Sequence, residues 1–248
     1  MRIGEDKSAE SSQKGFHQQR FKATERPQQL QQAELEIQIR EPVSDAELRA
    51  VALLRALSFY AYRPERAFAG KLHQKMKASE EYERLLELRE NGSKPEQQEA
   101  CLAAFCRWET VPLAPEELRV TSADGEDLAL VGSLDVCATR AVEGQVLIGA
   151  TLNAAYLSNV CVSEAARRRS VGRSLLNEAR RRAHEWGVDA LYVHTMAVNE
   201  VAQHFYCKHG FVLEREETSN EAHYRGHCLD GIEGRGRTVL LRVDRSSK

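Results

Sequence analysis

The chain has 248 residues, which is long enough for one large hydrophobic core. Of these residues 42% are hydrophobic and 29% are charged, a composition typical of globular proteins. Its 35 basic and 37 acidic residues give a formal net charge of -2, so the chain as a whole has no electrostatic attraction to nucleic acid or to an anionic membrane. The sequence contains no apolar run near the roughly 20 residues that a membrane-spanning helix needs, and we expect no such helix.

The N-terminal segment, residues 1–33, is rich in glutamine and serine and shows neither helical nor strand periodicity. This composition predicts a disordered tail. The segment has no apolar stretch of the kind found in a secretory signal, and its Glu5, Asp6 and Glu10 are atypical of an intact organelle transit peptide. A processed remnant of a transit peptide is compatible with the same residues.

Six cysteines are scattered along the chain, without the close pairs of a zinc site or the density of a disulfide scaffold. They favour reduced thiols in an intracellular compartment. The histidines between residues 184 and 209 also lack metal-ligand spacing, so no metal site is predicted.

The first predicted elements are a strand and two helices. Apolar and polar residues alternate over 35–39, as in a half-buried strand. Ser44 and Glu47 form a capping box, and apolar residues at helical spacing over 48–57 continue the helix that it opens. A second helix, long and heavily charged, is predicted over 65–91.

Three strands are predicted next, near residues 100–109, 128–140 and 154–162. The segment ADGED, 123–127, lies between the first two and has the composition of a hairpin loop. Beyond Gly172 an amphipathic helix follows, whose arginines we expect to lie largely outside the core. These arginines are Arg173, Arg180, Arg181 and Arg182.

The C-terminal part predicts a strand over 189–198, a helix over 199–210, and strands over 211–218 and 238–243. Strands and helices therefore alternate through most of the chain, interrupted by a run of consecutive strands. This order predicts a layered α/β domain in which strands pair both parallel and antiparallel.

The segment ARRRSVGRSLL, 166–176, carries four arginines around one glycine, between a predicted strand and a predicted helix. A turn at a helix N-terminus gathers free backbone N–H groups and the positive end of the helix dipole, which together bind anions. Gly172 permits close approach of the backbone, and the arginine side chains add charge. The segment therefore predicts a phosphate-binding loop.

This segment is similar to the pyrophosphate loop of the GNAT superfamily of acyl-CoA N-acyltransferases, whose usual pattern is Arg/Gln-x-x-Gly-x-Gly/Ala. Arg167 takes the first position and Gly172 the last. Ser170 departs from the pattern, because it stands where the family has its first glycine. Its Cβ restricts the turn, and the departure implies a modestly weaker affinity for the coenzyme.

Segments on both sides of the loop agree with this resemblance in order and spacing. AYLSNVCV, 155–162, resembles the family's bulged fourth strand, and NEVAQHFYCKHGFV, 199–212, resembles the signature of its fourth helix and the strand that follows. The resemblance implies an α/β fold with a mixed central β-sheet, a bulged fourth strand and helices on both faces. It implies one N-acetyltransferase domain over 34–245, with a helical insert at about 60–95.

Within the superfamily, segments 58–70, 155–172 and 185–194 most resemble the plant plastid acetyltransferases, which modify lysine side chains and protein N-termini. The resemblance implies acetyl-CoA as co-substrate, a protein or peptide amine as acceptor, and a plastid location, with the cytoplasm as the alternative. The charge balance predicts neither a nucleic acid nor a membrane as partner, and the oligomeric state is left open.

The resemblance also implies roles for individual residues. The backbone of Val160, Cys161 and Val162 is expected to pair with the pantetheine arm, and an N–H group there to steady the oxyanion. Tyr206 is expected to protonate the leaving thiolate. The other residues expected to contact the coenzyme are Arg167, Arg168, Arg169, Ser170, Val171, Gly172 and Arg173 in the loop, and Asn199, Glu200 and Val201 at the start of the following helix.

Two assignments stay open. Asn199 either hydrogen-bonds the coenzyme or serves only as a helix N-cap. The general base has no clear candidate, because the bulged strand offers only Ser158 and Asn159 where family members often place a glutamate. Deprotonation of the amine then passes through a water chain or through a group such as His194 or Glu200.

Functions from different classes fit these residues. The first is an acetyltransferase of protein amines, and a small arylalkylamine is an alternative acceptor for the same chemistry. A non-catalytic acyl-CoA-binding regulator is suggested by Ser170 and the missing base, and is opposed by Tyr206 and Asn199. A nucleic-acid-binding module is the weakest, because the net charge is near zero and the basic run contains no aromatic residue.

Overall fold

The computed structural model describes residues 35–62, 64–91, 98–139, 141–142, 145–146, 153–224 and 236–245. The predicted disordered tail, residues 1–33, lies outside them. No helix in these ranges is long and apolar enough to cross a membrane.

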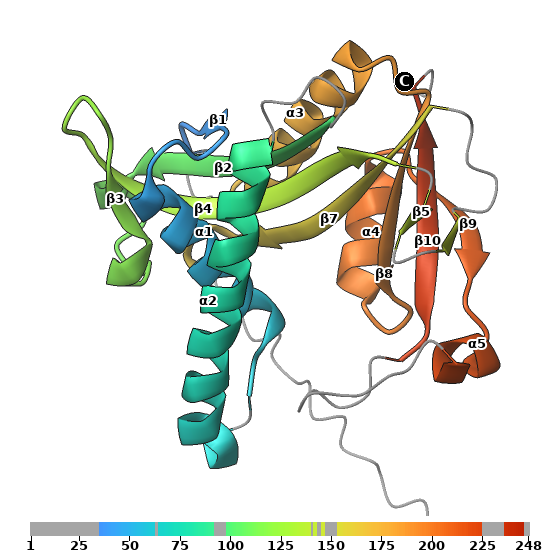
Figure 1. Ribbon diagram of the computed structural model, residues 1–248, viewed down its shortest axis with the longest axis horizontal. Helices are drawn as coiled ribbons and strands as arrows, with labels where there is room; N and C mark the ends of the chain where they lie inside the picture. Colours follow the sequence, from blue (N-terminus) through green and yellow to red (C-terminus); the bar gives the residue numbers. More distant parts are fainter. Residues whose placement is uncertain are drawn as a thin grey trace, which may run out of the picture. The chain divides into compact units, whose positions relative to one another are not determined.

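The described strands form a central sheet with the order β1-β2-β4-β7-β8-β10-β9, shown in Figure 1. Its neighbouring strands pair antiparallel except β7 and β8, which pair parallel, so the prediction of a mixed sheet is confirmed. A short strand, β3, pairs with β4, and β5 and β6 form a separate two-stranded sheet. The strands are β1 (Gln38–Arg40), β2 (Glu99–Arg107), β3 (Arg119–Thr121), β4 (Asp127–Ala138), β5 (Ala141–Val142), β6 (Gln145–Val146), β7 (Ala154–Val162), β8 (Ala190–Met196), β9 (Val212–Glu216) and β10 (Thr238–Asp244).

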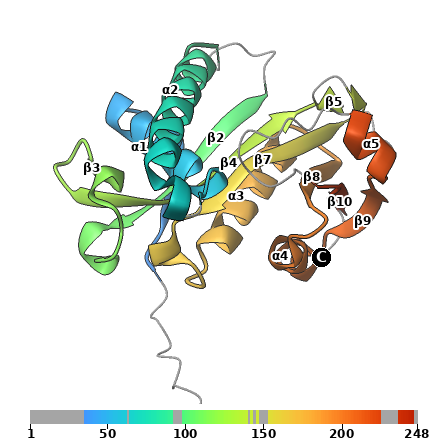
Figure 2. The ribbon, with the colours of Figure 1, turned by 90° about the horizontal axis from the view of Figure 1, so that it is seen from below.

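Helices cover both faces of the sheet, as the resemblance implied (Figure 2). On one face lie α1 (Asp45–Phe59) and α2 (Ala67–Asn91), and on the other lie α3 (Val171–Glu185) and α4 (Glu200–Lys208). Alternate residues of β2 serve the two sides, because side chains along a strand point to opposite faces. Phe105 packs in the cluster under α1, whereas Leu102 packs in the cluster under α3.

Local sequence signals set the ends of the helices. Ser44 caps α1, and its hydroxyl accepts a hydrogen bond from the Glu47 backbone while the Glu47 carboxylate accepts one from the Ser44 backbone, so the capping box is confirmed. Gly187 follows α3 with φ +73°, and Gly210 follows α4 with φ +83°. Both glycines adopt the left-handed conformation that commonly ends helices.

The structure differs from the prediction in several elements. The segment ADGED turns the chain between β3 and β4, and does not join β2 directly to β4, because β2 is followed by two short 3-10 helices, η2 (Trp108–Thr110) and η3 (Glu116–Leu118). The first strand begins at Gln38 and not at residue 35. The short helices η1 (Pro64–Arg66), η4 (Glu164–Ala166) and α5 (Ser219–Tyr224) were not predicted.

Candidate active site

A β-bulge interrupts β7 at its centre. Ser133 of β4 pairs with Cys161, but Asp135 pairs with Ser158, so β7 carries one more residue than its partner between these pairs. Asn159 lies in the bulge with φ +53°, a left-handed conformation that few non-glycine residues adopt. The bulge predicted in this strand is present.

Beyond the bulge, β7 and β8 separate. Their parallel pairing runs only from Ala154–Ala190 to Leu157–Val193. On one edge Ser158, Cys161 and Val162 still pair with β4, but no described strand pairs with the other edge of residues 158–162. The backbone groups of Val160, Cys161 and Val162 on that edge can therefore hydrogen-bond an extended ligand, as a further strand would.

The loop after β7 leads through η4 to the N-terminus of α3. Arg168 and Ser170 both have positive φ, 64° and 66°, and Ser170 is the N-cap of α3. Ser170 thus adopts the conformation for which the family pattern has glycine. The N–H groups of the first turn of α3, which includes Val171, Gly172 and Arg173, have no carbonyl partner within the helix and can bind an anion.

The arginines of the loop are held in different ways. Arg167 is exposed and pairs with Glu164 at 3.1 Å, whereas Arg169 is half-buried and donates to the backbone carbonyl of Thr110 at 2.8 Å. Arg168 and Arg173 are exposed. The loop therefore presents positive charge to solvent, with Arg169 fixed against η2.

Two arginines of α3 differ from the prediction that they lie largely outside the core. Arg180 is half-buried and donates to the carbonyl of His209 after α4, and burial lowers its pKa. Arg182 is half-buried and pairs with Glu41 at 2.6 Å. The helical pattern did not reveal that these side chains reach neighbouring segments. Arg173 and Arg181 are exposed, as predicted.

The helix α4 lies against the start of α3. A Cβ added at Gly172 would lie 3.3 Å from the Phe205 ring. Glycine at this position therefore allows α3 and α4 to pack closely against each other. Asn199 is the N-cap of α4, and its side-chain oxygen accepts from the Ala202 backbone at 3.0 Å. Glu200 and Val201 are exposed in the first turn.

Tyr206 is 5% exposed and packs edge-on against Phe205 and Phe211, with ring centroids 5.2 and 5.3 Å away. Burial, together with the neighbouring Tyr156 and Cys161, holds the pKa of the Tyr206 hydroxyl well above its ordinary value. The hydroxyl therefore keeps its proton at physiological pH and is available as a proton donor.

Tyr156 and His194 lie together beside the opening between β7 and β8. The Tyr156 hydroxyl and the His194 Nδ1 are 3.1 Å apart, and His194 is the first residue of β8 beyond the parallel pairing. On β8 side chains alternate, so His194 points to the face opposite Val193, which belongs to the core under α3. This pair thus lies on the other face of the sheet from the α4 helix that carries Tyr206.

A buried polar cluster next to the bulge was not predicted. Asp135 of β4, 1% exposed, accepts hydrogen bonds from Arg55 of α1, Arg84 of α2 and Asn159 of β7. The sequence contained a signal, because Arg55 falls on the apolar stripe of α1 and Asp135 interrupts an otherwise apolar strand. A charged residue at a core position generally requires a charged partner.

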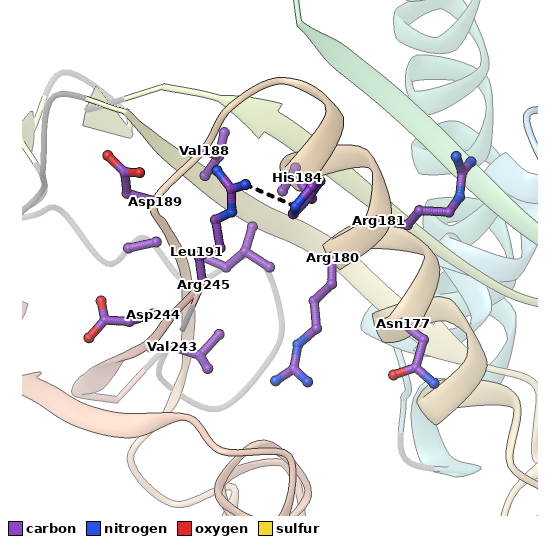
Figure 3. A pocket seen from close by; sticks show the side chains of 12 residues that line it. Asn177, Arg180, Arg181, His184, Val188, Asp189, Leu191, Val243, Asp244 and Arg245 are labelled. Carbon is purple, nitrogen blue, oxygen red and sulfur yellow. Dashed lines mark hydrogen bonds between the residues drawn. The ribbon is translucent and has the colours of Figure 1, made fainter. Parts of the chain in front are cut away.

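The residues described contain no group of three or more His, Cys, Asp or Glu side chains that could hold a metal ion. A cavity of about 340 Å³ lies at the other end of α3, among residues that include Arg180, His184 and Arg245. In Figure 3 the side chains of His184 and Arg245 point toward each other across this cavity, where they form a hydrogen bond of 2.9 Å. None of the residues predicted for coenzyme binding or catalysis lines it.

Comparisons with known proteins give consistent results. Residues 82–211 match the model of the acetyltransferase (GNAT) family. GCN5-related N-acetyltransferase 7, chloroplastic, of Arabidopsis thaliana is 34% identical over 195 residues, 75% of this chain and 71% of that protein. GCN5-related N-acetyltransferase 6, chloroplastic, of the same plant is 29% identical over 99 residues, 34% of each chain.

Among solved structures, PaiA N-acetyltransferase from Thermoplasma acidophilum, in complex with coenzyme A, has a similar fold. Its sequence identity is 17% and its TM-score is 0.51, with 85% of this chain and 99% of that chain covered.

Proposed function

The chain belongs to the GNAT family of acetyltransferases, and from this membership we propose that it transfers the acetyl group of acetyl-CoA directly to protein amines, both lysine ε-amines and N-terminal α-amines. The GNAT fold, with its mixed sheet and helices on both faces, is confirmed. The observation that carries the proposal is the opening between β7 and β8. Beside it lie a strand edge with which no described strand pairs, the N-terminus of α3 and a buried tyrosine.

Acetyl-CoA, the typical co-substrate of this family, supplies an acetyl thioester at the end of a long pantetheine arm and a pyrophosphate. The backbone of Val160, Cys161 and Val162 holds the arm along the open edge of β7. Ser170 and Gly172, with the exposed arginines around them, hold the pyrophosphate at the N-terminus of α3. Asn199 caps α4 through its side-chain oxygen, which leaves its amide nitrogen as the group that donates to the arm.

The transfer forms a bond between the amine nitrogen and the acetyl carbon and breaks the bond between that carbon and sulfur. A backbone N–H at Cys161 or Val162 stabilises the oxyanion that develops on the acetyl oxygen. Tyr206 donates its proton to the departing thiolate, the nitrogen releases a proton to solvent as the amide forms, and Tyr206 recovers a proton from solvent. The hydroxyl is protonated in the free protein, so it has a proton to donate when the thiolate forms.

The amine must lose a proton before it attacks, and His194 is the base that we propose. Its imidazole bonds to Tyr156, which lies near enough to Tyr206 to influence the pKa of the latter. Acid and base then act from opposite faces of the sheet, across one opening. Glu200 is less suitable, because it lies in the first turn of α4, on the same face as Tyr206.

The choice of protein amines as acceptors rests on the resemblance of segments 58–70, 155–172 and 185–194 to the plant plastid acetyltransferases. Both Arabidopsis relatives are plant proteins whose names place them in the chloroplast, which supports a plastid location over a cytoplasmic one. The regulator alternative is weakened by Ser170, because this residue keeps the left-handed turn of the loop although it is not glycine.

Mass spectrometry of a mixed pool tests the proposed function. Purified protein is incubated with isotopically labelled acetyl-CoA, lysine peptides with blocked N-termini, lysine-free peptides with free N-termini, and arylalkylamines, with the Gly172→Asp variant as control. We expect label on both kinds of peptide with the wild type and on none with the variant. Label on arylalkylamines alone would show that the acceptor is a small amine and not a protein. Binding of acetyl-CoA without any labelled product would make the protein a regulator.

A further inference from the structure

The bulge of β7 is held by a side-chain bond to a charged cluster that the acetyl transfer does not use. The Asn159 Nδ2 donates to Asp135 Oδ2 at 2.9 Å. The same oxygen accepts from Arg55 Nη1 at 2.9 Å and from Arg84 Nη2 at 2.7 Å, and Asp135 Oδ1 accepts from Arg55 Nη2 at 2.6 Å. We call Arg55, Arg84, Asp135 and Asn159 the Asp135 cluster.

Asp135 is unsuited to the role of general base. Burial alone would raise the pKa of its carboxyl, but the charges and hydrogen bonds of Arg55, with those of Arg84 and Asn159, outweigh burial and hold the pKa below its ordinary value. Both carboxylate oxygens are already occupied by these donors. A carboxylate buried at this cost needs another reason to lie beside the opening.

The buried carboxylate stabilises the backbone conformation of the bulge. A left-handed asparagine is unfavourable in isolation and persists only where its surroundings fix it. Asp135 lies at the register shift between β4 and β7, and α1 and α2 fix its carboxylate through one arginine each. The cluster therefore sets the position of Asn159 relative to β4.

We propose that Asp135, fixed by Arg55 and Arg84, is a positioning residue that holds Asn159 and thereby keeps the edge of residues 158–162 open for the pantetheine arm. The proposal rests on the proposed function, since it assigns this edge to acetyl-CoA. It predicts that the cluster governs binding of acetyl-CoA through this edge, and that it affects the chemical step only through the backbone N–H of Cys161 or Val162 on the same edge.

Asn159→Gly is the sharpest test, because glycine adopts the left-handed conformation freely and removes only the bond to Asp135. We expect the Kd and KM for acetyl-CoA to rise about tenfold, the change that loss of one hydrogen bond to a charged group produces, with a smaller fall in kcat because the oxyanion N–H lies on the same edge. Unchanged Kd and KM would overturn the proposal, since the side chain would then serve only the backbone conformation.

A double-variant cycle provides an independent test. Arg84 is 38% exposed, so Arg84→Gln is expected to fold and to raise the Kd for acetyl-CoA in the same direction. Because both residues act through Asp135, we expect the double variant to bind no more weakly than Asn159→Gly alone. Additive losses would contradict a shared cluster. Asn177→Gly, in the exposed part of α3, is the matched control and is expected to lose stability without a change in Kd.

Hydrogen exchange of the free protein separates failure of this proposal from failure of the proposed function. If wild-type protein does not bind acetyl-CoA, the proposed function fails. Faster amide exchange over 158–162 in Asn159→Gly would still show that the cluster holds the bulge. Exchange equal to that of the wild type would overturn the positioning role itself.

Discussion

The Tyr206 side chain lies between two aromatic rings on α4 and the segment that follows it, and its hydroxyl is close to β7. The rings fix the side chain, and burial keeps the hydroxyl protonated. A phenylalanine at this position would keep the ring contacts and remove only the hydroxyl. The contribution of the ring can therefore be separated from that of the hydroxyl.

Tyr206→Phe is expected to lower kcat about 100-fold, the lower end of the range for general acid catalysis, while the Kd for acetyl-CoA stays within about twofold. Steady-state kinetics and calorimetry measure the two quantities. Tyr82→Phe on α2, which removes a hydroxyl far from the opening, is the control and should leave both unchanged. Full turnover by Tyr206→Phe would remove the hydroxyl from the mechanism.

The left-handed conformation of Ser170 gives a second prediction at the level of one residue. Ser170→Gly is expected to raise the free energy of unfolding by about 0.5 to 1 kcal/mol, because glycine adopts φ +66° without steric cost. The same change at Ser174, inside α3, is expected to lower it by about 0.5 to 1 kcal/mol. Denaturant unfolding measures both, and a loss of stability in Ser170→Gly would show that its side chain stabilises the loop.

Among the elements, α3 and α4 meet where the loop of residues 167–172 turns into a helix. Gly172 lies against the ring of Phe205, so a side chain at this position requires the ring or one helix start to shift. The anion-binding turn and the helix that carries the proton donor are therefore packed together. A substitution at Gly172 acts on both.

Gly172→Asp is expected to abolish detectable binding of acetyl-CoA, because it adds a negative charge where the phosphates bind and a side chain where Phe205 packs. Gly172→Ala is the matched control for size without charge and should bind severalfold more weakly than the wild type. Calorimetry measures both. If the aspartate and alanine variants bind acetyl-CoA equally tightly, the phosphates do not bind at the start of α3.

Much of the fold could be predicted from the sequence, because apolar periodicity depends on which face of an element is buried. The start of α1 follows from its capping box, and the end of α3 from Gly187. Contacts between segments far apart in the chain are harder to predict from the sequence. The hydrogen bond from Asn159 to Asp135 joins residues 24 positions apart. The sequence of β4 shows that Asp135 interrupts an apolar strand, but it does not show which residues neutralise its charge.

The whole molecule places two layers of helices over one sheet and buries several thiols between them. The five cysteines within the described ranges are free, and those at 101, 137 and 161 have raised pKa values of about 12, 11 and 11, with burial the largest cause. A pKa that is higher in the folded than in the unfolded state contributes stability below the unfolded pKa, near 9. That contribution is lost as the pH rises toward the folded value.

The free energy of unfolding is therefore expected to fall between about pH 9 and 11, by up to roughly 1.4 kcal/mol per pH unit for each buried thiol. Urea unfolding at a series of pH values measures this slope. Cys161→Ala should reduce it. A slope that the Cys161 variant leaves intact would mean that other groups cause the alkaline loss.

The structure of the protein bound to a conjugate of coenzyme A and a lysine peptide would test the site most directly. We expect the pantetheine arm to pair with the backbone of Val160–Val162, the pyrophosphate to lie at the start of α3, and the Tyr206 hydroxyl to lie within hydrogen-bond distance of the sulfur. A conjugate bound outside the opening between β7 and β8, or a sulfur beyond the reach of Tyr206, would contradict the proposed mechanism.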